Sequence, residues 1–218
     1  MNSKKIGIFG GTFNPVHKGH ELAAVSFYNK LGLDKLIIMP SNIPPHKQAD
    51  ANVTAVQRLE MCRIAFGGLE TETKIEVEVS DFEVKKEGKS YTFDTVSDLR
   101  KTYKNDKLYF LIGSDMFLYF ENWYKHLELL KLCALAVAYR NINDNENEAG
   151  KREILNMRDR LVQTGAEIEL LENEPFEISS TEIRAEIRKN IYCNDNAGYI
   201  KYIKTEVLDY IKKQGIYL

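Results

Sequence analysis

Four runs of consecutive apolar residues constrain this chain more than any other feature. They are IGIF at 6–9, KLIIM at 35–39, KLYFLI at 107–112 and LCALAVAY at 132–139. A strand without polar alternation is typical of a parallel sheet whose two faces are both covered. Because stretches of helical periodicity separate these runs, the sequence predicts an α/β fold, a doubly wound parallel sheet with helices on both faces.

The helical stretches and two further strands complete the predicted organisation. Helices are expected at Glu21–Leu33, Ala55–Phe66, Phe93–Tyr103, Arg152–Val162, Thr181–Lys189 and Gly198–Lys213, and strands at residues 74–84 and Ala166–Leu171. The polar stretch at 141–150 is expected to be a surface excursion. We therefore expect a single domain over residues 1–218, with a small C-terminal helical part from about 181.

Composition excludes several classes of protein. The formal net charge of −2 over 218 residues removes the usual electrostatic case for a nucleic-acid or membrane partner. No apolar run approaches the ~18 residues of a membrane span. Cys62, Cys133 and Cys193 are odd in number and far apart, which indicates reduced thiols rather than a disulfide framework. No signal peptide is recognisable, so a cytoplasmic location is expected.

The turn after the first apolar run combines a glycine pair with two histidines. Gly10-Gly11 matches neither GxGxxG nor the P-loop, which excludes the two commonest phosphate cradles. His17 and His20 are three residues apart, so on a helix they share one face. Cations in a first turn oppose the helix dipole by ~0.3–1 kcal/mol each unless an anion binds there. Two surface histidines without a ligand are the alternative, but their clustering favours an anion site.

The whole stretch Gly10–His20 resembles the GGTFxPxHxGH signature of the bacterial nicotinate-nucleotide adenylyltransferases, of the HxGH nucleotidyltransferase superfamily. The resemblance implies a Rossmann-like fold. It also implies transfer of the adenylyl group of ATP, accompanied by Mg²⁺, to nicotinate mononucleotide. The products would be deamido-NAD and pyrophosphate, as a step of NAD biosynthesis.

The resemblance also assigns roles within this stretch. His17 and His20 would be catalytic and contact the α- and β-phosphates. The phosphate-binding backbone and hydroxyl groups would come from Gly10, Gly11, Thr12, Phe13 and Gly19. Asn14, where many relatives have Asp, would contact the mononucleotide.

Two more motifs allow both a local and a functional interpretation. Pro44-Pro45-His46-Lys47 by itself indicates a proline turn, and it resembles the PPHK motif, in which Lys47 is catalytic and His46 contacts the mononucleotide. Ser179 with Glu182 forms a capping box. The same stretch resembles the ISSTxIR motif, which implies phosphate contacts for Ser179, Ser180 and Thr181 and a catalytic role for Arg184.

Three further elements concern the nucleotides. Thr92 is expected to cap a helix, while the resemblance of Ser90–Thr95 to SYTxDT places Tyr91 and Thr92 near the nicotinate carboxylate. The segment Ile112–Asp115 is a helix cap in the local interpretation, and it resembles the family's IGxD nucleotide contact through Gly113 and Asp115. Trp123 alone favours core packing, but its position matches the family's stacking Trp, where cation–π contact with the pyridinium contributes roughly 0.5–2 kcal/mol.

Several other residues carry no functional pattern, and other functions remain as alternatives. Arg58 and the C-terminal tyrosines, Tyr217 included, form no pattern and are expected to be helix surface and packing. No spacing indicates metal ligands, so Mg²⁺ would be held by phosphates and water. The alternatives are a sister nucleotidyltransferase acting on phosphopantetheine, FMN or glycerol phosphate, a class I aminoacyl-tRNA synthetase, and a nucleotide-sensing module. The sequence leaves open whether the chain forms a homo-oligomer.

Overall fold

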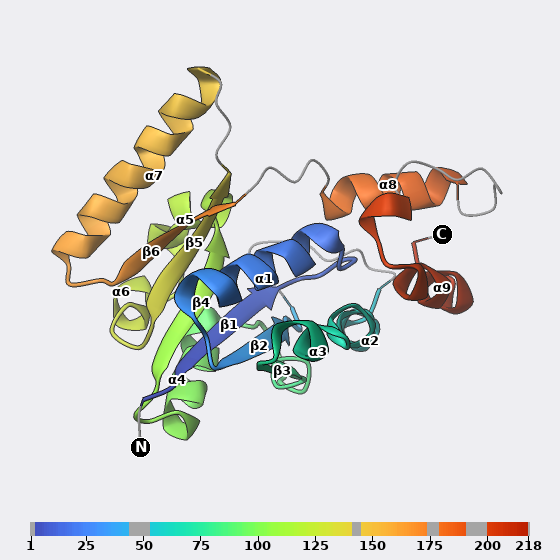
Figure 1. The fold of residues 1–218 in the computed structure, drawn as a ribbon, viewed down its shortest axis with the longest axis horizontal. Helices are drawn as coiled ribbons and strands as arrows, with labels where there is room; N and C mark the ends of the chain where they lie inside the picture. Colours follow the sequence, from blue (N-terminus) through green and yellow to red (C-terminus); the bar gives the residue numbers. More distant parts are fainter. Residues whose placement is uncertain (1–2, 44–52, 141–144, 174–178, 191–199, 218) are drawn as a thin grey trace. The chain divides into compact units, whose positions relative to one another are not determined.

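The computed structural model describes residues 3–43, 53–140, 145–173, 179–190 and 200–217. Six strands form one sheet in the order β3-β2-β1-β4-β5-β6 (Figure 1). The strands are β1 (Lys5–Gly11), β2 (Lys35–Pro40), β3 (Glu76–Val79), β4 (Lys107–Gly113), β5 (Ala134–Arg140) and β6 (Ile168–Asn173). This arrangement confirms the predicted doubly wound sheet.

The strand order follows from the apolar runs. β1 pairs in parallel with β4, β4 with β5 and β5 with β6. The interior residues of β1 and β4 are buried on both sides, as predicted for strands without polar alternation. The chain runs outward from β1 to β3 and then returns past β1 to β4. In such sheets ligands bind where the order reverses, at the carboxyl ends of the two central strands, which are β1 and β4 here.

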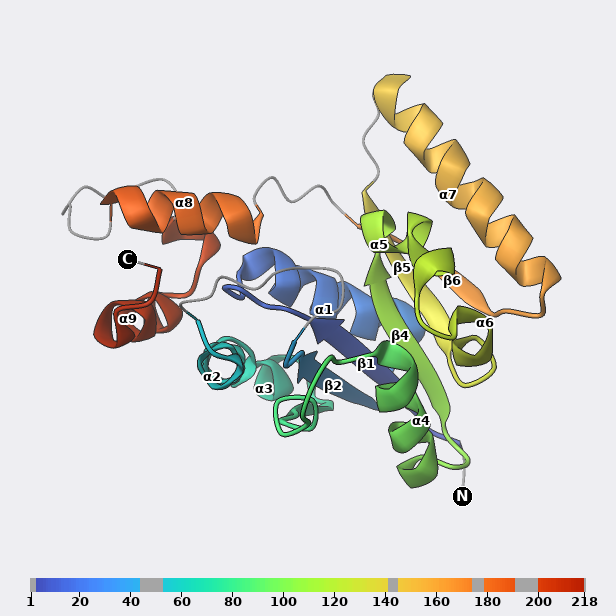
Figure 2. The same ribbon diagram turned by 180° about the vertical axis from the view of Figure 1, so that it is seen from behind.

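Helices cover both faces of the sheet. In Figure 1, α1 (Lys18–Leu31) lies over the near face of β1 and β4, and the reverse view in Figure 2 shows α4 (Thr92–Thr102) on the other face. The remaining α-helices are α2 (Ala55–Phe66), α3 (Leu69–Thr73), α5 (Ser114–Leu118), α6 (His126–Leu129), α7 (Asn145–Gln163), α8 (Ser180–Asn190) and α9 (Thr205–Gln214), and short 3₁₀ turns lie at Phe120–Asn122 and Ile200–Tyr202. None of the helices in the described part of the chain combines the length and apolarity that crossing a bilayer would need.

Three expectations about element boundaries were wrong. The C-terminal helix expected over Gly198–Lys213 begins only at Thr205, after a separate 3₁₀ turn at Ile200–Tyr202. α7 begins at Asn145, so most of the supposed surface excursion at 141–150 is helix; residues 141–144 lie outside the described part. Its buried Ile154, Met157 and Leu161 anchor a helix whose earlier residues carry no apolar stripe, and this removed the periodic signal. The strand expected over 74–84 is confined to Glu76–Val79, because turns follow it.

The chain forms two compact units, each discontinuous in sequence. The first comprises Met1–Gly10, Val25–Ile37 and Tyr91–Pro175, and the second comprises Gly11–Ala24, Ile38–Ser90 and Phe176–Leu218. The first unit therefore contains the paired strands β4 to β6 and most of β1, while the second contains the turn after β1 and the C-terminal helices. The expectation of a single domain stays a prediction.

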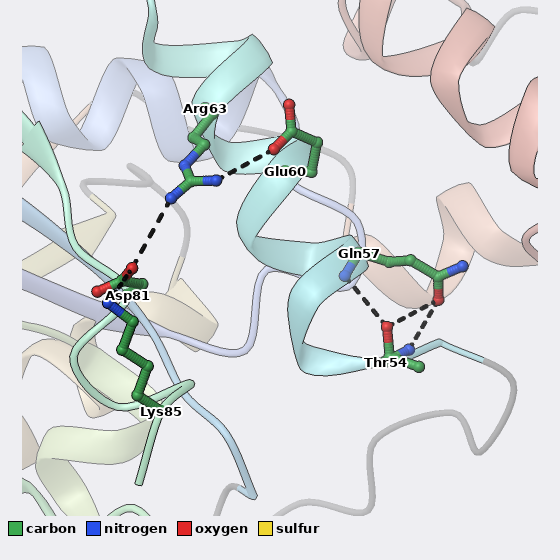
Figure 3. Close-up of polar contacts among 6 residues, drawn as sticks. All are labelled: Thr54, Gln57, Glu60, Arg63, Asp81 and Lys85. Carbon is green, nitrogen blue, oxygen red and sulfur yellow. Dashed lines mark hydrogen bonds and ion pairs between the residues drawn. The ribbon is translucent and has the colours of Figure 1, made fainter.

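A capping box begins α2 (Figure 3). The Thr54 hydroxyl accepts a hydrogen bond from the Gln57 N–H at 3.2 Å, and Gln57 Oε1 accepts one from the Thr54 N–H at 2.9 Å. Thr54→Ala should therefore lower the free energy of unfolding by about 1 kcal/mol, because a helix N–H loses its acceptor. Urea denaturation measures this change. Thr54→Ser keeps the hydroxyl and is the control; equal losses in both variants would contradict the capping role.

Candidate active site

The turn between β1 and α1 is shaped by Phe13. Its backbone has φ of 48° and its side chain is 1% exposed. The Phe13 ring contacts the His20 ring at a centroid distance of 5.0 Å and Phe66 of α2 at 6.2 Å. A Cβ atom at position 11 would lie 2.9 Å from the Phe13 ring, so Gly11 is required for this ring to fold back against the chain.

His17 and His20 lie together at the start of α1. Their ring centroids are 3.8 Å apart. The Gly19 N–H donates to Nδ1 of His17 at 3.1 Å, and the His17 N–H donates to Nδ1 of His20 at 3.2 Å. The His17 carbonyl in turn accepts hydrogen bonds from the N–H groups of His20 and Glu21. His17 therefore caps the helix through its imidazole as well as through its backbone.

These hydrogen bonds determine the tautomer of both rings. A nitrogen that accepts an N–H carries no proton, so in the neutral imidazoles the proton is on Nε2. Each ring can therefore donate through Nε2 without being a cation. Both rings accept an N–H group at the helix start through Nδ1, so these two hydrogen bonds do not depend on a positive charge on either ring.

The start of α8 meets the same turn within the second unit. The Ser180 hydroxyl donates to the Pro15 carbonyl at 3.0 Å. Arg184 donates to the Asn14 carbonyl at 2.6 Å and to the Thr181 hydroxyl at 3.2 Å. Two helix N-termini, of α1 and α8, are thus tied to one short segment, and helix N-termini bind phosphate.

The capping box predicted for α8 is confirmed. The Ser179 hydroxyl accepts from the Glu182 N–H at 3.2 Å, and Glu182 Oε2 accepts from the Ser179 N–H at 2.7 Å. Glu182 Oε2 also accepts from the Ser179 hydroxyl. In this structure the Ser179 side chain is therefore engaged in starting the helix.

Two buried side chains that belong to no sequence motif also hold this turn. Tyr217 is 1% exposed, and its hydroxyl donates to Oδ1 of Asn14, which is itself 6% exposed. Arg58 is 1% exposed and donates to the Thr12 carbonyl at 2.7 Å. Both had been expected to be surface or packing residues. No local pattern in the sequence could have identified them, since their partners are remote along the chain.

The first unit contains the predicted residues at the carboxyl ends of β1 and β4. Gly10 follows Phe9, which is in register with Leu111, and Gly113 ends β4. Gly113 is the N-cap of α5, and Asp115 is exposed in the first turn of that helix. A helix does start here, but the expected side-chain cap is not present, because Gly113 is the N-cap residue and no side chain donates or accepts a capping hydrogen bond. A nucleotide contact for Asp115 stays a prediction.

Trp123 lies near the same end of the sheet. Its ring meets Phe110 of β4 edge-on at a centroid distance of 6.0 Å and Phe120 at 5.4 Å. A Cβ atom at position 10 would lie 3.0 Å from the same Phe110 ring. Gly10 and Trp123 therefore both adjoin Phe110, and Trp123 is only partly buried.

The start of α4 differs from the expected cap. Tyr91, not Thr92, is the N-cap residue, and its side chain makes no capping hydrogen bond. The Tyr91 ring instead packs against Tyr124 at 4.9 Å. Thr92 had been expected to cap because a hydroxyl usually does, but here it is the first residue of the helix. The predicted acidic residue of the first turn, Asp94, is in place.

The structure thus brings the predicted residues together in two groups. The second unit holds the turn residues with α8, namely Gly11, Thr12, Phe13, Asn14, His17, Gly19, His20, Ser179, Ser180, Thr181 and Arg184. The first unit holds Gly10, Tyr91, Thr92, Gly113, Asp115 and Trp123. His46 and Lys47 lie outside the described residues, as does Cys193.

No thiol in the described residues is suited to nucleophilic chemistry. Cys62 and Cys133 are free and buried. Burial raises the pKa of the Cys133 thiol to about 12 and raises the pKa of Cys62 well above its ordinary value. Both thiols are thus uncharged at neutral pH, whereas a thiolate is the reactive form. Across the described residues, no group of three His, Cys, Asp or Glu side chains could hold a metal ion.

The sequence of this chain matches a family model and several known proteins. The cytidylyltransferase-like family model matches residues 8–186. The chain is 47% identical over 129 residues to the nicotinate-nucleotide adenylyltransferase of Bacillus subtilis, covering 59% of this chain and 66% of that protein. It is 36% identical over 217 residues to a protein of Carboxydothermus hydrogenoformans described as a "probable nicotinate-nucleotide adenylyltransferase", covering 100% of both.

Solved structures share the fold. The Plasmodium falciparum nicotinic acid mononucleotide adenylyltransferase complexed with NaAD superposes with a TM-score of 0.75. That match covers 98% of this chain and 97% of the other at 21% sequence identity. The same enzyme complexed with APC gives a TM-score of 0.72.

Proposed function

Because the chain belongs to the cytidylyltransferase-like family, and within it to the nicotinate-nucleotide adenylyltransferases, we propose that it transfers the adenylyl group of ATP to nicotinate mononucleotide. The products are deamido-NAD and pyrophosphate. One observation of the structure supports this most directly: His17 and His20, each able to donate through Nε2, lie at the start of α1.

The reaction requires charge stabilisation rather than a nucleophilic side chain. A 5′-phosphate oxygen of nicotinate mononucleotide attacks the α-phosphorus of ATP and forms a P–O bond. The bond from the α-phosphorus to the oxygen shared with the β-phosphate breaks, and its electron pair leaves with pyrophosphate. Transfers of this kind are accelerated chiefly by positioning the two phosphates and by stabilising the charge that develops.

The residues of the turn supply that stabilisation in our proposal. Nε2–H groups of His17 and His20 donate to the α- and β-phosphate oxygens, and the starts of α1 and α8 contribute their oriented N–H groups. Arg184, which already donates a hydrogen bond to the Asn14 carbonyl, forms an ion pair with the phosphate oxygens. The backbone at Gly10 to Phe13 and at Gly19, with Gly113, Asp115, Ser179, Ser180 and Thr181, completes the phosphate and ATP contacts, and Lys47 is the further cation.

The mononucleotide is proposed to contact Trp123, Tyr91, Thr92, Asn14 and His46. Trp123 would stack on the pyridinium ring, whose positive charge the indole face attracts. Tyr91 is the N-cap and Thr92 the first residue of α4, and a helix N-terminus is a place where a carboxylate binds. A carboxylate accepts such hydrogen bonds more strongly than an amide does, which supports nicotinate over nicotinamide.

Trp123 is the single tryptophan of the chain, so tryptophan fluorescence reports on the contact between Trp123 and the mononucleotide. Saturating nicotinate mononucleotide should quench the emission, while AMP, which lacks the pyridinium, should change it much less. Trp123→Ala should raise the Kd of the mononucleotide about tenfold, as loss of a cation–π contact does. An emission spectrum unchanged at saturation would show that Trp123 is structural.

One assay tests the substrate assignment. Pyrophosphate release is measured with ATP, Mg²⁺ and either the acid or the amide mononucleotide. We expect the acid to give the higher kcat/KM. A higher value with the amide would contradict the choice of substrate, and the absence of pyrophosphate with either would contradict the reaction itself. FMN, phosphopantetheine and glycerol phosphate serve as the competing acceptors.

Three further properties belong to the same proposal. Mg²⁺ enters as part of the substrate, bound to the phosphates of ATP. The small net charge supports small-molecule substrates and no nucleic-acid or membrane partner. A cytoplasmic location agrees with the free thiols Cys62 and Cys133.

A further inference from the structure

We propose that Arg58 is a positioning residue for adenylyl transfer: it holds the Thr12 turn against the segment after β2 and places a buried positive charge behind the phosphate site. Its kinetic consequences rest on the proposed function. The contacts on which it depends all lie within the second unit.

Arg58 joins two loops through one guanidinium group. Nη1 donates to the Thr12 carbonyl at 2.7 Å, and Nη2 donates to the carbonyls of Ser41 and Asn42 at 2.7 and 2.8 Å. Thr12 follows β1, whereas Ser41 and Asn42 follow β2. The Ser41 N–H also donates to the Gly11 carbonyl at 2.9 Å. The two strand ends are thus held in a fixed relation, with Arg58 as the side chain that bridges them.

The position of Arg58 on α2 is unusual for a charged residue. The side chain is 1% exposed, while the apolar Val56 of the same helix is 64% exposed. Nε of Arg58 is buried without a hydrogen-bond partner among the described residues. Burying a guanidinium without full compensation is destabilising. Such an arrangement at a turn implicated in binding is typical of a residue retained for function.

The charge of Arg58 is not neutralised by a carboxylate within the described residues. Its partners there are the three carbonyl oxygens. Burial lowers the pKa of Arg58 from its ordinary value, opposed by the nearby Cys62 and Tyr217, but an arginine remains charged in proteins. Arg63, on the same helix, instead pairs with Glu60 at 3.3 Å and with Asp81 at 4.0 Å (Figure 3).

An uncompensated buried charge acts over a longer range than a surface pair. Its field is screened less than that of Arg63, whose side chain is 49% exposed. Because Nη1 contacts the Thr12 carbonyl directly, this field extends into the turn that carries His17 and His20. Arg58 therefore contributes both a fixed backbone geometry and a positive potential for an incoming polyphosphate.

Substitution of Arg58 by lysine can separate its effect on the backbone geometry from its effect on the electrostatic potential. Arg58→Lys keeps a positive charge but lacks the planar fork that reaches carbonyls of two loops at once. Arg58→Met removes both the charge and the fork while keeping an unbranched side chain. Arg63→Met on the same helix removes a charge that already has carboxylate partners, and it is the matched control.

The experiment compares the full-length parent with these three variants. Steady-state kcat and KM come from pyrophosphate release, the Kd of pyrophosphate comes from calorimetry without turnover, and hydrogen exchange follows peptides covering residues 11–14 and 41–43. Arg58→Met should lower kcat about 30-fold and raise the pyrophosphate Kd about tenfold, with faster exchange in both peptides. Arg58→Lys should keep the Kd within about threefold but still lower kcat about tenfold. Arg63→Met should stay within about twofold of the parent.

A merely structural role predicts a different pattern. Arg58→Met would then lower the denaturation midpoint but leave kcat, the pyrophosphate Kd and exchange at 11–14 unchanged, and this result overturns the proposal. If Arg58→Met does not fold, Arg58→Lys decides: parental kcat together with parental exchange overturns it. If the parent releases no pyrophosphate, the proposed function fails, whereas exchange and pyrophosphate affinity still test the role of Arg58.

Discussion

Replacing His20 with Ala should lower kcat for adenylyl transfer about 100- to 1000-fold, the loss typical of removing one donor that stabilises developing charge. The variant loses the Nε2–H group proposed to contact a phosphate. It also leaves the His17 N–H without its acceptor, Nδ1 of His20. The His17 ring, 3.8 Å away, loses its neighbour as well. Pyrophosphate release measures the rate, and circular dichroism verifies that the variant is folded.

Two further variants serve as a partial rescue and a control for His20→Ala. His20→Gln keeps an N–H donor on a side chain of similar reach and should recover part of the rate. Lys18→Ala changes the exposed first residue of α1 and should leave the rate within about threefold. A His20→Ala rate within tenfold of the parent, a barrier change of only about 1.4 kcal/mol, would contradict the assigned role.

The second large expected effect is on the free energy of unfolding, from a substitution in the first unit. Gly7→Val should lower the free energy of unfolding by about 3 kcal/mol or more, at the upper end of what overpacking costs. A Cβ atom at position 7 would lie 2.4 Å from Cδ1 of Leu33 and 2.8 Å from Cε1 of Phe27. Phe27 of α1 is fully buried and Leu33 nearly so, which leaves neither side chain room to move away.

Urea denaturation measures the loss, since the transition midpoint falls with stability. Gly68→Ala is the matched control, because a Cβ atom there meets no atom within 4 Å. Its stability should stay within about 0.5 kcal/mol of the parent. Equal midpoints for Gly7→Val and the parent would show that α1 does not pack closely on β1.

Much of the fold was predictable because its signals are local. The apolar runs identified β1, β2, β4 and β5, and α2 begins and ends where its periodicity predicts. The capping box of Ser179 and Glu182 needs only residues three apart, and it is present. The start of α7 was missed because the sequence before Ile154 has no apolar periodicity. The cap of α4 was misplaced by one residue because Tyr91 packs on Tyr124 and leaves Thr92 inside the helix.

Within the candidate site, the motif identified the right segment but not the hydrogen bonds that hold it in place. The spacing of His17 and His20 correctly placed both rings together at the start of a helix. It did not reveal that each Nδ1 accepts an N–H group, which depends on the conformation of the turn.

The sequence by itself determined the strands, most of the helices, the glycine turn with its two histidines and, through these motifs, the family. Only the tertiary structure decided that Arg58 is buried while Val56 is exposed, and that Tyr217 reaches Asn14. Arg58 and Thr12 are 46 residues apart, and Tyr217 and Asn14 are 203 apart. Periodicity and capping depend on neighbours within a turn or a strand. The partners of a buried polar group are set by which loops the folded sheet brings together, and no local pattern contains that information.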